Sequence, residues 1–109
     1  MIDYLQPKDG AVLPGEERRE KIYAEDQPAY KPLRALKSLG PDGAVLSRWS
    51  PTEEQRKAIA GGKDIFLELL TFNRPLQPIL MFIAGDEDTA EVKDHLWPLT
   101  HQVFERPAG

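Results

Sequence analysis

The 109-residue sequence contains no cysteine. This excludes disulfides, thiolate zinc ligands and thiol nucleophiles together, because each of them requires a cysteine sulfur. A surplus of positive charge is also missing, since the formal net charge is -4 and the isoelectric point is about 5.2. Neutralising phosphates takes clustered lysine and arginine, so we expect no binding to nucleic acid or to an anionic membrane.

Long hydrophobic runs are absent as well. The longest, residues 78–84, suits a strand and falls far short of the roughly 20 apolar residues of a membrane helix. The first seven residues lack the basic-then-apolar pattern of a signal peptide. We therefore expect no membrane partner and a cytoplasmic location.

The composition is that of a folded protein, with 40% hydrophobic and 29% charged residues. The length leaves room for one domain and one core. Residues 16–21 form a charged run with few apolar anchors, so residues 1–29 are interpreted as a partly flexible N-terminal arm, with a short exposed helix as the alternative. Residues 30–109 are interpreted as a single α+β domain.

Two hairpins are predicted in that domain. Residues 31–39 and 44–49 flank the turn signal Gly40-Pro41-Asp42-Gly43 and predict the first. Residues 64–72 and 76–84 are the most hydrophobic part of the chain, and the reversal Asn73-Arg74-Pro75 separates them. They predict a second hairpin that forms the core.

Helices are predicted between and after the hairpins. Ser50 as N-cap, Pro51 at the first helical position and Glu53 at the third make a capping box, and glycines 61 and 62 end a helix of about ten residues. A short helix at about 89–96 and a last strand at 100–104 follow. The resulting β-β-α-β-β order predicts an α+β fold, a small antiparallel sheet of two hairpins with one or two short helices packed on one face.

No constellation of catalytic or ligating residues stands out. His95 and His101 are the only histidines, and their surroundings lack the spacing of a zinc site. The acidic residues 86–88 lack the glycine and ligand spacing of a calcium loop. We expect no cofactor and no metal, and a function other than catalysis is favoured.

Interaction residues are predicted at the tip of the second hairpin. Exposed arginine and aromatic side chains are typical anchors of protein interfaces, and the candidates are Phe72, Asn73, Arg74, Gln77 and, outside the tip, Trp49. The alternative is that Phe72 belongs to the core while Asn73 and Arg74 simply make the turn. Trp49 is equally consistent with a core-boundary residue that closes over the helix start.

Several stretches together carry a family resemblance. They lie in residues 23–36 and 44–83, and the most distinctive are Leu46-Ser47-Arg48-Trp49, residues 51–56, Gly62-Lys63-Asp64-Ile65 and residues 70–79. The pattern resembles small uncharacterised proteins encoded by bacteriophages and prophages. The resemblance implies a role inside an infected bacterial cell and carries no catalytic or binding residue with it.

Three hypotheses of function remain open. The first is a non-enzymatic phage accessory protein that binds a host or phage protein, including inhibition of a host defence or regulatory factor. The second is a self-associating assembly protein, a homo-oligomer formed through the apolar strands between residues 65 and 83. The third is a small hydrolase or metal-dependent enzyme, which would rest on His95, His101 and the nearby acids.

Overall fold

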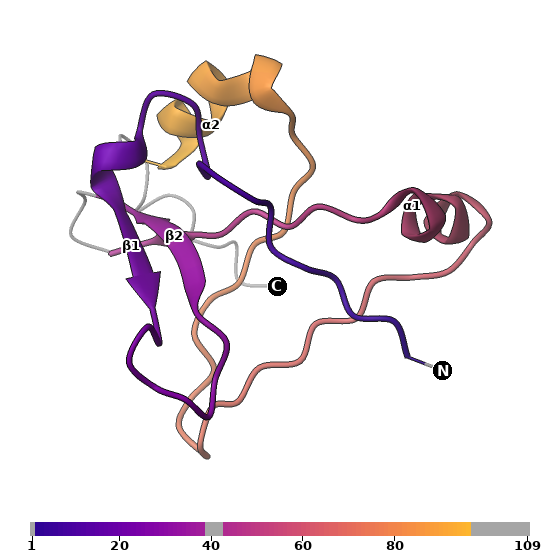
Figure 1. The fold of residues 1–109 in the computed structure, drawn as a ribbon, viewed down its shortest axis with the longest axis horizontal. Helices are drawn as coiled ribbons and strands as arrows, with labels where there is room; N and C mark the ends of the chain where they lie inside the picture. The colour runs from indigo at the N-terminus through magenta and orange to yellow at the C-terminus, as the bar shows by residue number, and fades with distance from the viewer. Residues whose placement is uncertain (1, 39–42, 97–109) are drawn as a thin grey trace, which may run out of the picture.

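The computed structural model describes residues 2–38 and 43–96 of the chain. Its elements in chain order are η1 (Glu17–Arg19), β1 (Glu20–Tyr23), β2 (Leu33–Lys37), β3 (Val45–Leu46), α1 (Glu53–Ala60), η2 (Asp86–Asp88) and α2 (Thr89–Leu96). A three-stranded antiparallel sheet and two α-helices confirm the α+β class in general (Figure 1). The expected four-strand order is not confirmed.

The sheet has the order β1-β2-β3, and both pairings are antiparallel. β2 pairs with β3 through Leu36 opposite Leu46, on either side of the predicted turn, so the first hairpin is confirmed. β1 pairs with the other edge of β2, with Glu20 opposite Leu36 and Tyr23 opposite Leu33. This edge strand lies within residues 1–29, where the sequence suggested an arm or an exposed helix.

The core is small and is assembled from residues far apart in the sequence. Val12 and Leu13 pack with Leu36 of β2 and Val92 of α2, and Ala44 and Leu46 pack against this cluster. Leu36 has no exposed surface. Residues 1–29 therefore supply both an edge strand and two of the four buried residues of the cluster.

The prediction of a second hairpin is wrong, because the structure assigns no strand to residues 64–84. The reversal exists, since the Arg74 amide donates to the Thr71 carbonyl at 3.0 Å. From this turn one arm leads back to α1 and the other on to α2, and the two diverge (Figure 1). Pro75 and Pro78 remove two N–H donors next to the turn, where a hairpin ladder would have to start.

Helix α1 begins two residues later than predicted. Its N-cap is Thr52, whose hydroxyl accepts from the Gln55 amide at 3.1 Å while the Gln55 side chain accepts from the Thr52 amide at 2.9 Å. The predicted cap, Ser50, instead donates its amide to the Gln6 carbonyl at 3.0 Å. Ser50 therefore pairs with the N-terminal segment and lies outside the helix.

The end of α1 follows the glycine signal. The Lys63 amide donates to the Ala58 carbonyl and the Gly62 amide to the Ile59 carbonyl, each at 3.0 Å. With Gly62 at a φ of 108°, this pair of bonds is a Schellman motif. α1 stands away from the sheet (Figure 1), and Ile59, on its expected apolar face, is 37% exposed.

The second helix lies where the sequence predicts it. The Gly85 amide donates to the Asp88 carboxylate at 2.8 Å, which closes the η2 turn ahead of α2. Val92 then enters the core, and Lys93 pairs with Glu16 at 3.0 Å. α2 thus packs against β2 and the N-terminal segment. The predicted strand 100–104 falls outside the described residues.

Candidate functional site

The predicted tip is a tight turn of unusual backbone geometry. Phe72 and Asn73, its two central residues, have φ angles of 53° and 64°. Positive φ at both central positions is the mark of a type I′ turn, whose twist suits a hairpin. Asparagine tolerates this region, whereas a bulky phenylalanine there costs about 1 kcal/mol or more. The turn therefore holds Phe72 in a conformation that phenylalanine itself disfavours.

The side chains of the tip project into solvent. Phe72 is 72% exposed, and Asn73, Arg74 and Gln77 are exposed as well. Within residues 2–38 and 43–96, the Arg74 guanidinium takes part in none of the ion pairs. The alternative that Phe72 is a core residue does not hold. An aromatic ring and an unpaired cation instead stand two residues apart on one turn.

Trp49 lies at a different place, beside the N-terminal segment. It forms an antiparallel bridge with Pro7, and its indole N–H donates to the Ser47 hydroxyl at 2.9 Å. The side chain remains 45% exposed. It lines a pocket that none of the tip residues lines. The structure therefore separates the five predicted interaction residues into the tip and Trp49.

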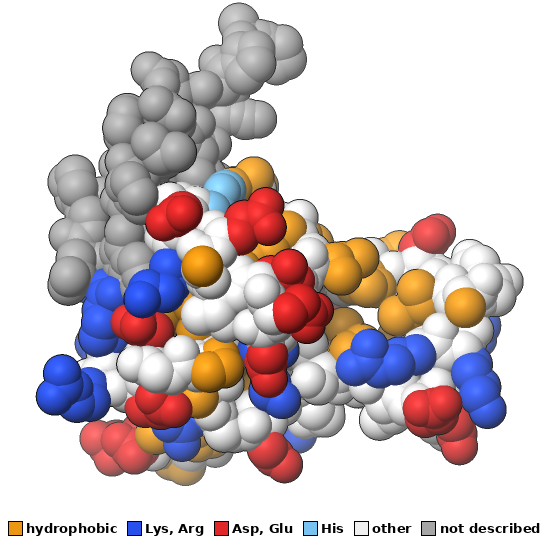
Figure 2. Space-filling view, turned by 90° about the horizontal axis from the view of Figure 1, so that it is seen from above, with side chains coloured by type: hydrophobic (Ala, Val, Ile, Leu, Met, Phe, Trp, Pro, Cys, Tyr) orange, Lys and Arg blue, Asp and Glu red, His pale blue; other side chains and the backbone are white. Residues whose placement is uncertain are grey.

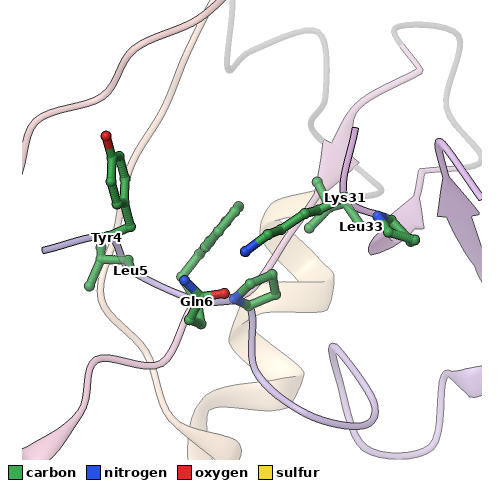
Figure 3. A pocket seen from close by; sticks show the side chains of 8 residues that line it. Tyr4, Leu5, Gln6, Lys31 and Leu33 are labelled. Carbon is green, nitrogen blue, oxygen red and sulfur yellow. The ribbon is translucent and has the colours of Figure 1, made fainter. Parts of the chain in front are cut away.

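The pocket beside Trp49 has a volume of about 430 Å³. In Figure 3 Lys31 extends toward Gln6, with Tyr4 beyond Leu5 on the far side. The residues that line the pocket come from three separate segments, namely residues 4–7, residues 31–33 and Trp49. The lining offers two aromatic rings and one ammonium group, which suits a flat apolar group that carries negative charge.

Sequence reasoning missed the contribution of the N-terminal segment to this pocket. The Lys8 amide donates to the Arg48 carbonyl at 2.8 Å, and the Ser50 amide donates to the Gln6 carbonyl at 3.0 Å. These bonds lay residues 6–8 along residues 48–50. The sequence of the N-terminal segment gives no indication of that pairing, because its partners are forty or more residues away.

The described acidic residues and His95 do not converge on a ligating site. Within the described parts of the chain, no group of three or more histidine, aspartate or glutamate side chains is arranged to hold a metal ion. His95 packs edge-on against Phe82, with ring centroids 5.5 Å apart. His101, the other predicted candidate, lies outside the described residues. The enzyme hypothesis is therefore supported only by the sequence observations that suggested it.

The described helices are also too short or too polar for a membrane span. The expectation of a cytoplasmic location remains a prediction.

Comparison with known proteins adds no relative to this picture. No protein-family model, no curated protein and no solved structure matches the chain. The resemblance to phage-encoded proteins therefore stays an expectation from the sequence.

Proposed function

We propose that this chain is a non-enzymatic protein-binding module that contacts its partner through the 71–74 turn. The observation that supports this most is the exposed Phe72 ring, which is held at positive φ beside the unpaired Arg74. Backbone strain of this kind persists where the surrounding structure requires it and often accompanies function. The resemblance to phage-encoded proteins supports a host or phage protein as partner, with inhibition of a host defence or regulatory factor as the role.

The chemistry of the tip suits such a contact. Aromatic rings and arginine dominate the binding energy of protein interfaces, because both bury a large rigid surface and arginine also donates several hydrogen bonds. The turn restricts the backbone before binding, which lowers the entropy lost on association. Asn73 and Gln77 add side-chain amide groups at the edge of the proposed contact surface. A partner surface with an apolar pocket and a nearby carboxylate would match this arrangement.

The turn geometry allows a clean experiment. Phe72→Gly removes the ring but keeps a residue that adopts positive φ freely, and Arg74→Ala removes the cation. The partner is first identified by affinity capture from infected bacterial cells and mass spectrometry, then purified for calorimetric titration. Each variant should weaken the complex at least about tenfold, the effect of a hot-spot residue.

The matched control is Tyr30→Ala, which removes another exposed aromatic ring, 49% accessible, outside the tip. It should leave the affinity within about twofold. Circular dichroism should show that all variants keep the wild-type helix and strand content. Full affinity in both tip variants would exclude the tip as the contact.

A further inference from the structure

The two arms that flank the turn expose an apolar surface that the fold leaves uncovered. Every residue from 61 to 84 except Thr71 is exposed. The apolar side chains concerned, with exposed fractions from 40% to 102%, are Ile65, Phe66, Leu67, Leu69, Leu70, Leu76, Ile79, Leu80, Met81, Phe82 and Ile83. Figure 2 shows hydrophobic side chains gathered on the side of the molecule toward α1. This is far more than the scattered apolar residues of an ordinary surface.

The exposed area of the chain is correspondingly large. It amounts to 9072 Å², whereas a compact monomer of 12.3 kDa exposes about 6,100 Å². The radius of gyration, 15.2 Å, also exceeds the roughly 13 Å of a compact domain of this length. An obligate homodimer buries about 1,000–2,500 Å² on each chain, so part of this excess is enough to form one.

The backbone of the arms is unpaired as well. Between described residues, no ladder hydrogen bond involves residues 64–70 or 75–84. Residues 79–84 contain neither proline nor a charged side chain. Apolar segments of about six residues with these properties readily pair with another strand. The arms thus offer both hydrophobic surface and free main-chain donors and acceptors.

We propose that a second copy of this chain covers the arms, and that residues 79–84 of the two copies pair antiparallel across a two-fold axis. In such an isologous interface each copy supplies the apolar side chains and the backbone groups that the other lacks. Residues 65–70 then pack beside the central pair. Glu68 makes them less suited to the axis itself, because symmetric pairing would bring two like charges together.

Charge favours a second copy over an outside protein. Residues 79–84, which form the central pair, carry no charged side chain in a chain of net charge -4. A neutral segment does not repel its own copy and does not select a strongly charged partner. The tip is separate from this interface, so the dimer does not depend on the proposed function.

Sedimentation velocity of the full chain, from about 1 to about 100 µM, tests the proposal. We expect a species of twice the chain mass whose population follows mass action. Ile83→Lys changes the side chain that is 102% exposed and places two like charges close to the axis. It should weaken the dimer at least about tenfold. Ile2→Lys, at a residue 74% exposed outside the arms, is the matched control and should leave the dimer unchanged.

Hydrogen exchange locates the pairing. Amides of residues 79–84 should exchange slowly in the concentrated wild type and fast in Ile83→Lys, while those of β2 stay protected in both. A wild type that remains monomeric at the highest concentration overturns the proposal, as does a dimer that Ile83→Lys leaves intact. Phe72→Gly should dimerise normally, so loss of partner binding and loss of the dimer are separate results.

Discussion

The Gln55 side chain joins the start of helix α1 to the N-terminal segment, 51 residues away, because its amide N–H donates to the Tyr4 carbonyl at 3.1 Å. The same side chain accepts from the Thr52 amide, and its own backbone N–H donates to the Thr52 hydroxyl. Gln55 is 8% exposed, although both its neighbours in the helix are exposed. A buried glutamine is tolerated here because its side-chain amide is hydrogen-bonded at both ends.

Gln55→Ala should lower the free energy of unfolding by about 2 kcal/mol. The change removes the reciprocal half of the capping box and leaves the partly buried Tyr4 carbonyl without its donor. Urea denaturation followed by circular dichroism measures the effect. Glu54→Ala, one residue earlier on the exposed face, should cost less than about 0.5 kcal/mol. Equal losses in the two variants would show that the Tyr4 contact contributes nothing.

Arg34→Ala should destabilise the sheet through Glu20. The Glu20 side chain is only 3% exposed and accepts from Arg34 Nη1 and from the Val12 amide, both at 2.7 Å. Removal of the guanidinium leaves a nearly buried carboxylate with one hydrogen-bond donor. Because the Arg34 side chain is 43% exposed and solvent screens the pair, we expect the free energy of unfolding to fall by only about 2 kcal/mol.

A double-mutant cycle with Glu20→Ala isolates this interaction, with a coupling energy of about 1 kcal/mol expected from equilibrium denaturation. Arg56→Ala, which removes an exposed arginine from α1, serves as the control and should be near neutral. A coupling energy of zero would mean that Glu20 is held by the Val12 amide alone.

Leu36→Ala tests where the core of the monomer lies. Leu36 is fully buried among Val12, Leu13 and Val92, so truncation leaves a cavity and should cost about 3 kcal/mol. Leu67→Ala should cost less than about 0.5 kcal/mol when it is measured in the monomeric Ile83→Lys background, because Leu67 is 51% exposed. The opposite ranking would restore the predicted second hairpin as the core.

Gly62→Ala should weaken the end of α1 by about 1 kcal/mol. A Cβ at this position meets no atom within 4 Å, so the cost arises from the φ of 108° alone. Gly62→Asn should lose less, because asparagine tolerates the left-handed region better than alanine. Thermal unfolding at matched concentrations compares the two, and an alanine variant as stable as the asparagine variant would contradict the backbone explanation.

The sequence alone predicted the features that depend on neighbouring residues. Glycines 61 and 62 end α1, the acidic residues 86–88 precede α2, and the chain reverses at Asn73, since in each case the signal and its effect lie within a few residues. The first hairpin was also predicted, because its two strands flank one strong turn signal. The exposure of Phe72 does not belong to this local group, because it depends on the second hairpin not forming.

Tertiary structure decided what depends on distant partners. Thr52, two residues after Ser50, is the N-cap, while the Ser50 amide is bonded to the distant Gln6. Val12 and Leu13 joined the core, and Trp49 came to lie beside Pro7, through contacts that no local pattern signals. Hydrophobicity predicted that residues 64–84 form the core, whereas the structure leaves their apolar side chains exposed. The hydrophobic effect is non-directional, so the pattern could not tell which apolar residues the fold buries.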